Sequence, residues 1–202
     1  EPGGRVYLAM ELLQGDTLQQ VLERHGRLPW RRAVGIAAQI CRGLRAAHGC
    51  GIVHGDLQAS SVVLTDVGEE RDHVKLVGFG LGGGPFRRAT GESFGPAPAG
   101  ASDVAAVGAI LYRMITGRAP SEGAGADGVD ATPRSPLLAP ARLLAAAPDV
   151  DCPPELEAVI LQCLAPRPAG SFVGVEELLH ALRNVLGGLS TTGASLASFA
   201  ST

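Results

Sequence analysis

The fold of this chain is decided by the stretch Gly51-Ile52-Val53-His54-Gly55-Asp56-Leu57-Gln58-Ala59-Ser60-Ser61-Val62-Val63-Leu64, together with Gly78-Phe79-Gly80 further along. The first stretch passes from glycines that end a helical pattern, through polar residues with one carboxylate, into an apolar run. That run, Ser61 to Leu64, and a second one, Val74 to Val77, have the composition of β-strands. We therefore predict a β-hairpin whose strands are joined by a polar loop over residues 65–73.

Most of the remaining chain shows helical periodicity, with apolar residues three and four positions apart. A strand over Val6 to Met10 comes first, and the glycine- and proline-rich residues 82–100 are predicted to be a loop. The predicted helices are a short one capped by Thr17, a long one from Trp30 to His48, one capped by Ser102 that ends at Gly117, one opened by Pro153 and Pro154, and a last one from about Val175 to Leu186.

Composition limits the class of protein. The 202 residues include 46% hydrophobic and 18% charged residues, and the formal net charge is −3. This chain is long enough for one substantial core, and its charge gives no basic patch of the kind that nucleic-acid binding needs. No apolar run approaches the length of a membrane span. The four cysteines are not at CxxC spacing, so we expect reduced thiols in a cytoplasmic protein rather than a metal site.

Several motifs in the same order as in one known family make the sequence more specific. Met10 to Leu18 resembles the hinge between the lobes of a eukaryotic-like protein kinase, Ala46 to His54 resembles the end of its long helix and the start of its catalytic loop, and Ser102 to Arg118 resembles its central helix. The chain is most similar to the C-terminal lobe of bacterial serine/threonine protein kinases. The resemblance implies an α+β, mainly α fold: a helical bundle with a small β-hairpin.

The same resemblance implies a division of the chain. Residues 1–16 would be the last strand of the N-terminal lobe and the hinge, residues 17–186 the C-terminal lobe, and residues 187–202 a disordered low-complexity tail. The rest of the N-terminal lobe would be missing from this sequence, as in a piece of a longer protein. A second family, the small-molecule phosphotransferases that include aminoglycoside and choline kinases, also has glycine after the histidine of its loop. The Trp30 helix and the block Ser102 to Arg118 favour the protein kinases.

Two residues correspond to the catalytic positions of the family. Asp56 occupies the position of the catalytic base, which orients and deprotonates the attacking hydroxyl. The alternative is that Asp56 only braces the loop. Gln58 replaces the family's lysine, and a neutral amide can donate a hydrogen bond but cannot neutralise developing charge.

The two metal-binding positions are altered more severely. Ser61 stands where the family has a metal-binding asparagine, and its hydroxyl reaches less far. Gly78 stands where the family has the aspartate that coordinates magnesium, and glycine has no side chain. We therefore predict no cofactor for this sequence, whereas an active enzyme would need ATP and Mg²⁺.

Other positions of the family are retained. Met10, Glu11 and Leu13 in the hinge and Val63 below it would contact a nucleotide, if one binds. A second set, His54, Phe79 and Asp103, corresponds to residues that pack or hydrogen-bond beneath the catalytic loop, and we expect these three to be structural.

Retained scaffold residues and exchanged metal ligands together predict a pseudokinase, a signalling module that binds or regulates a protein partner or adjacent domains of a longer parent chain. The alternative is an active but atypical serine/threonine kinase that transfers the γ-phosphate of ATP to a protein hydroxyl, with Asp56 as the base.

Overall fold

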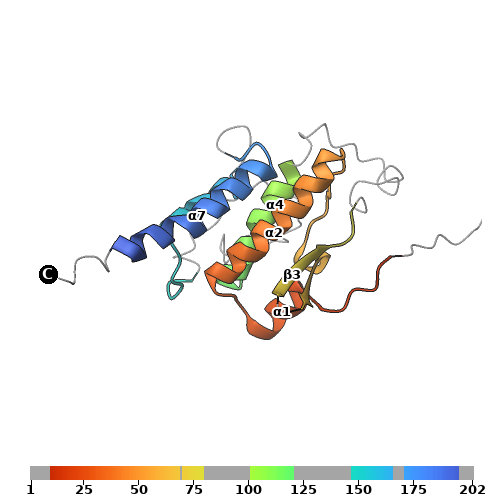
Figure 1. Cartoon of the computed structure of the whole chain (residues 1–202), viewed down its shortest axis with the longest axis horizontal. Coiled ribbons are helices and arrows are strands. Elements are labelled where there is room, and N and C mark those ends of the chain that lie inside the picture. The colour runs from red at the N-terminus through yellow and green to blue at the C-terminus, as the bar shows by residue number, and fades with distance from the viewer. Residues whose placement is uncertain (1–9, 69, 80–100, 121–146, 166–170, 196–202) are drawn as a thin grey trace, which may run out of the picture.

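The computed structural model describes residues 10–68, 70–79, 101–120, 147–165 and 171–195. These residues form a mainly helical lobe with one small antiparallel sheet, which confirms the predicted fold class (Figure 1). The sheet lies beside the short helix α1 (Leu18–His25) and is also contacted by the long helix α2 (Trp30–Gly49), against which other longer helices pack. The predicted loop at 82–100 lies outside the described residues.

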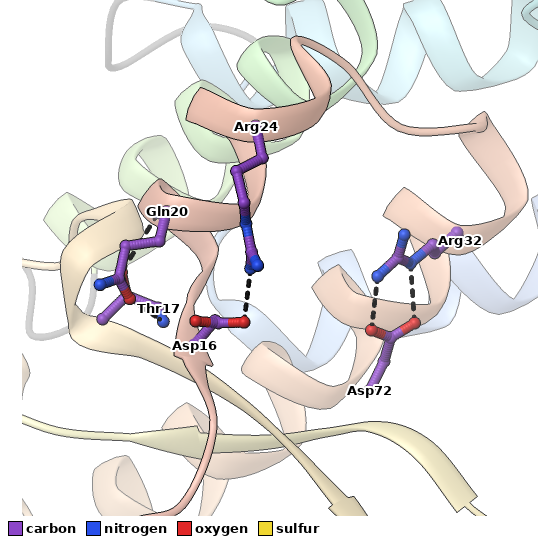
Figure 2. A network of polar contacts seen from close by, with 6 residues as sticks. All are labelled: Asp16, Thr17, Gln20, Arg24, Arg32 and Asp72. Carbon is purple, nitrogen blue, oxygen red and sulfur yellow. Dashed lines mark hydrogen bonds and ion pairs between the residues drawn. The ribbon is translucent and has the colours of Figure 1, made fainter.

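Helix α1 begins as its sequence predicts. The Thr17 hydroxyl accepts a hydrogen bond from the Gln20 N–H (3.2 Å), and the Gln20 carboxamide oxygen accepts one from the Thr17 N–H (2.8 Å), as Figure 2 illustrates. This reciprocal capping box satisfies two N–H groups that would otherwise lack partners. Gly26 ends the helix at a φ of +72°, a conformation that glycine adopts without steric cost.

Helix α2 (Trp30–Gly49) is the central element and confirms the predicted long helix. Its buried face contributes to one continuous core with α4 (Ala101–Thr116), α6 (Pro154–Leu164) and α7 (Val175–Ser195). Helix α2 contacts both α4 and α7, and Figure 1 shows these helices close together. None of the helices in the described part of the chain is long and apolar enough to cross a membrane.

The sheet contains β1 (Asp16–Thr17), β2 (Val62–Val67) and β3 (Glu70–Leu76) in that order, all antiparallel. The hairpin is confirmed, but the loop predicted over 65–73 is wrong because both strands extend into it. A register shift between Thr65 and Val67 accommodates the polar residues, and Asp72 adopts a φ of +58°. Backbone pairing at a bulge does not require apolar side chains, so a prediction from composition alone made both strands too short.

Strand β1 at Asp16–Thr17 was not predicted. Residues 6–9 of the predicted first strand lie outside the described residues, and Met10 is not in a strand. Gly15 allows Asp16 to pair with Leu64. A Cβ at position 15 would lie only 2.1 Å from the Leu64 carbonyl oxygen and would prevent this close approach. The chain can therefore approach β2 only with glycine at this point.

Two other boundaries differ from the prediction. Helix α4 begins at Ala101, so Ser102 lies inside the helix and is not its cap. Helix α7 continues to Ser195, whereas a disordered tail was expected from Gly187. Extending an existing helix adds a hydrogen bond without a new nucleation cost, which lets α7 pass Gly187 and Gly188 despite their low propensity.

Two ion pairs fix the sheet against the helices. Figure 2 shows Arg24 of α1 directed at Asp16, and Arg32 of α2 facing Asp72 of β3. The Arg32 Nε and one terminal nitrogen each donate to a different oxygen of Asp72 at 2.8 Å, and this contact raises the pKa of Arg32. Such bidentate pairs add geometric definition more than stability when they are partly exposed.

Candidate functional site

The candidate site begins where α2 ends. The Ile52 N–H donates to the Ala47 carbonyl at 2.9 Å, and Gly51 and Gly55 adopt φ values of +74° and +78°. These left-handed residues turn the chain back beneath the helices, since glycine has no Cβ to clash in this region. The loop then enters a short 3₁₀ turn, η1 (Ala59–Ser61), which leads directly into β2.

Asp103 of α4 anchors this loop from below. Its carboxylate is buried, with 1% of the side chain exposed, and it accepts hydrogen bonds from the N–H groups of His54 and Gly55, both at 3.0 Å. The His48 ring nitrogen Nε2 lies 2.8 Å from the same carboxylate. A buried carboxylate needs such partners, because an unpaired one would be costly.

His54 joins the loop to the segment before Gly78. Its side chain is buried, its Nε2 lies 3.1 Å from the Val77 carbonyl, and its ring centroid lies 4.7 Å from that of Phe79. The structure therefore brings His54, Phe79 and Asp103 into one contiguous arrangement. Their assignment as structural residues stays a prediction. The His54 Nδ1 atom is buried and has no hydrogen-bond partner among the described residues.

Ser61 and Gly78 lie close together because Ser61 is hydrogen-bonded to Val77, the residue that precedes Gly78. The Ser61 carbonyl accepts from the Val77 N–H at 3.0 Å, and His54 contacts the Val77 carbonyl. Gly78 follows at once with a φ of +86°. The two expected metal positions are thus adjacent in the fold. Across the described residues, no three or more His, Cys, Asp and Glu side chains are grouped so that they could hold a metal ion.

Asp56 and Gln58 interact directly on the exposed side of the loop. The Gln58 carboxamide nitrogen donates to Asp56 Oδ1 at 2.9 Å, and both residues are exposed. The Gln58 carbonyl also accepts from the Ser61 N–H at 3.0 Å, which fixes the turn into η1. Gln58 therefore orients Asp56 with a neutral donor.

Two of the proposed nucleotide contacts, Glu11 and Val63, are linked through Lys75 of β3. Glu11 forms an ion pair with Lys75 at 3.0 Å, and Lys75 pairs across the sheet with the buried Val63. Met10 is 67% exposed and Leu13 is half-buried. Their assignment to nucleotide binding stays a prediction, as do the catalytic and metal assignments above.

His48 is the site residue whose role the sequence did not predict. It lies six residues before His54 in a stretch that marked the end of the long helix, but no spacing rule connects it to Asp103, which is 55 residues away. Only the packing of α2 against α4 brings the two together.

Comparison with known proteins agrees with this geometry. A family model described as a protein kinase domain matches residues 1–86. The serine/threonine-protein kinase Pkn3 of Myxococcus xanthus is 33% identical over 204 residues, which cover 90% of this chain and 36% of that protein. The crystal structure of the Mycobacterium tuberculosis PknI kinase domain superposes with a TM-score of 0.63 at 27% identity, over 87% of this chain and 64% of that one. The chain belongs to the bacterial serine/threonine protein kinase family.

A second curated kinase is also similar to this chain. The serine/threonine-protein kinase PknK of Mycobacterium bovis is 34% identical over 134 residues, which cover 59% of this chain and 12% of that protein. This chain therefore spans 36% and 12% of the lengths of the two curated kinases. The similarity identifies the family and the kinase-like fold.

Proposed function

We propose that this member of the kinase family is a pseudokinase, a lobe that acts by binding protein partners or neighbouring domains rather than by efficient phosphoryl transfer. The observation that carries the proposal is Gly78, because the residue in the metal-ligand position has no side chain. Ser61 beside it offers one neutral hydroxyl. Mg²⁺ requires oxygen ligands and in kinases is held by a carboxylate and an amide. The donor set at these two positions therefore does not fit Mg²⁺.

The supporting observation is that the scaffold below the loop is complete. Asp103 has its hydrogen-bond donors, and His54 contacts both the Val77 carbonyl and the Phe79 ring. A chain that keeps this costly buried network while exchanging its metal ligands retains what binding needs, namely a rigid surface. Gln58 fits the same view, since a neutral amide offers little stabilisation to the charge that develops in phosphoryl transfer.

The second candidate is an active but atypical kinase, and Asp56 is the observation in its favour. Its carboxylate is exposed at the position of the base, and one hydrogen bond from Gln58 orients it while Oδ2 has no partner among the described residues. That arrangement suits a group that accepts a proton from a substrate hydroxyl.

A phosphorylation assay separates the two candidates. The protein is incubated with radiolabelled ATP and Mg²⁺, with a serine- and threonine-containing peptide library as substrate, and the intact gene product is assayed beside the 202-residue chain. We expect no Mg²⁺-dependent incorporation with the natural sequence. Incorporation that Asp56→Asn abolishes would favour the active kinase and overturn the pseudokinase proposal.

Nucleotide binding is tested in the same preparation by thermal denaturation with millimolar ATP, with and without Mg²⁺. Gly78 has a positive φ, where any side chain is strained, and aspartate is among the residues that tolerate this conformation best, so Gly78→Asp restores the carboxylate at a lower cost than most side chains would. We expect Mg²⁺ to increase the ATP-induced shift in melting temperature for Gly78→Asp but not for the natural sequence. Gly78→Ala is the matched control, since it adds a Cβ at the same backbone position without an oxygen ligand.

A further inference from the structure

The outer edge of β3 has a regular pattern of backbone groups. The register Val63↔Lys75 and the hydrogen bond from the Val77 N–H to the Ser61 carbonyl show that alternate residues of β3 face β2. In an antiparallel ladder the intervening residues direct their N–H and C=O groups away from the partner strand. Asp72, Val74 and Leu76 therefore present backbone groups at the outer edge of the sheet.

Gln39 of α2 occupies the first pair of these groups. Its carboxamide nitrogen donates to the Asp72 carbonyl at 2.9 Å, and its carboxamide oxygen accepts from the Val74 N–H at 3.1 Å. One side-chain amide thus pairs with β3 as the peptide group of a neighbouring strand would. The next outward pair is the Val74 carbonyl and the Leu76 N–H, and neither has a hydrogen-bond partner within the described ranges.

Helix α2 has no side chain of its own beside this second pair, and the Leu76 side chain lies against the helix there. Gly43 follows Gln39 by four residues, so it lies one turn along the same face of the helix but has no side chain. A cavity of about 470 Å³ opens here. Its lining includes Gln39 and Gly43 of α2 together with Val74 and Leu76 of β3, and also Phe79.

The lining also defines the charge of a matching ligand. Its ionisable side chains are Arg42, His73 and Lys75, and it contains no Asp or Glu. Lys75 already pairs with Glu11, whereas Arg42 has no carboxylate partner among the residues that the structure describes. Half-buried Val74, Leu76 and Phe79 provide an apolar surface beside this positive charge.

We propose that this groove between α2 and β3 binds an extended acidic segment of a partner protein, which pairs with the Val74 carbonyl and the Leu76 N–H as an added strand. Main-chain hydrogen bonds would supply part of the affinity, as in other complexes formed by strand addition. Acidic side chains of the segment would face Arg42, and apolar ones would contact Leu76 and Phe79. The groove can act in this way whether or not the chain transfers phosphate.

The first test needs no ligand and compares two amides of β3 by hydrogen exchange with NMR detection. Val74 is held by Gln39, while the Leu76 N–H faces the groove, so we expect Leu76 to exchange about tenfold faster or more. The measurement is made on the intact gene product as well as on the 202-residue chain. Equal protection of the two amides in either preparation would show that the edge is already occupied and would overturn the proposal.

The second test uses synthetic probes. A hexapeptide of alternating Glu and Val, acetylated and amidated, is titrated against a matched peptide of alternating Lys and Val. We expect the acidic probe to protect the Leu76 amide and to bind about tenfold more weakly to Arg42→Glu, since one charge-assisted contact is lost. Protection by both probes alike, or by neither, would count against the proposal.

A substitution in the groove completes the design. Gly43→Gln places a second carboxamide opposite the Val74 and Leu76 pair, and only the flexible end of the Leu76 side chain, 2.9 Å from the new Cβ, has to move. It should abolish probe binding while preserving the folded spectrum. Gly35→Gln, in the same helix with nothing within 4 Å of the new Cβ, is the control and should bind the acidic probe normally. Undiminished binding by Gly43→Gln would refute the assignment of the groove.

Discussion

The His54 backbone N–H donates a 3.0 Å hydrogen bond to the Asp103 carboxylate, which lies 49 residues further along the chain. This bond joins the loop that carries Asp56 to the helix at the centre of the lobe. The Gly55 N–H and the His48 ring contact the same carboxylate. The geometry of the loop is therefore set by one buried acid, and the first prediction concerns that residue.

Asp103→Asn should destabilise the protein by about 2 kcal/mol or more, because an amide has one acceptor oxygen where the carboxylate uses two, and its NH₂ group would face other donors. Urea unfolding measures the loss. Asp66→Asn is the control, since Asp66 is exposed and has no ion-pair partner in the described part of the chain. An unchanged unfolding midpoint for Asp103→Asn would contradict the role assigned to this carboxylate.

Gln39 provides a second prediction. Gln39→Leu leaves the Asp72 carbonyl and the Val74 N–H without partners, and we expect a cost of about 1–3 kcal/mol together with faster exchange of the Val74 amide. Gln39→Glu keeps an acceptor for Val74 but loses the donor to Asp72. It should therefore preserve the Val74 protection better than Gln39→Leu does. If both variants exchange like the natural chain, Gln39 does not hold the edge.

The packing of α4 against α6 depends on Gly108. A Cβ on this residue would lie 2.3 Å from the Cβ of Cys163, so the helices would have to separate. We expect Gly108→Ala to lower the free energy of unfolding by about 1–3 kcal/mol, as overpacking of a core does. Adding Cys163→Gly should recover part of this loss by removing the clashing atom.

Gly187 offers the matched control for that substitution. It lies in α7 with nothing within 4 Å of a new Cβ, so Gly187→Ala should stabilise the helix by about 0.5–1 kcal/mol. Thermal or urea unfolding of the two single variants should therefore give changes of opposite sign. A loss of stability in both would show that α7 is not helical at this position or that the packing differs.

The buried thiols predict how stability depends on alkaline pH. Burial raises the pKa of Cys41 from 9.0 to about 12 and that of Cys152 to about 11, and it raises the pKa of Cys163 further. Above pH 9 the unfolded chain loses these thiol protons while the folded chain keeps them, so the folded state loses relative stability as pH rises through that window. Below pH 9 these groups should contribute no pH dependence.

Urea unfolding at several pH values between 8 and 11 checks this expectation. Cys41→Ala should reduce the slope of the free energy of unfolding against pH by about 1.4 kcal/mol per pH unit above pH 9, since one proton difference is removed. Cys50→Ala alters an exposed thiol and is the control. An identical slope for Cys41→Ala and the natural chain would show that the Cys41 thiol is accessible to solvent.

Much of the architecture was predictable from local sequence. Thr17 and Gln20 are the correct pair for a capping box, the periodicity from Trp30 onward gave the central helix, and Pro154 marks the start of α6. The tight turns at Gly51 and Gly55 have the residue that positive φ requires. These features depend on neighbours within about one helical turn, so composition and spacing are sufficient to find them.

The candidate site was predictable only in its parts. His54, Asp56, Ser61 and Gly78 could be selected as positions in a family pattern, but His48 and Gln39 could not, because their partners lie 55 and 33 residues away. The extent of β2 and β3 was also missed, since a bulge and a residue at positive φ let polar residues stay in the ladder.

The sequence by itself determined the family, the helices and the absence of a side chain at position 78, because these follow from residue identity and short-range spacing. The tertiary structure was needed to show that Asp103 holds the loop, that Ser61 is hydrogen-bonded to Val77 beside Gly78, and that Gln39 pairs with the edge of β3 while, among the described residues, the Val74 carbonyl and the Leu76 N–H have no partner. Those relationships join residues distant in the chain, and the packing of α2 against α4 and β3 is what brings them into contact.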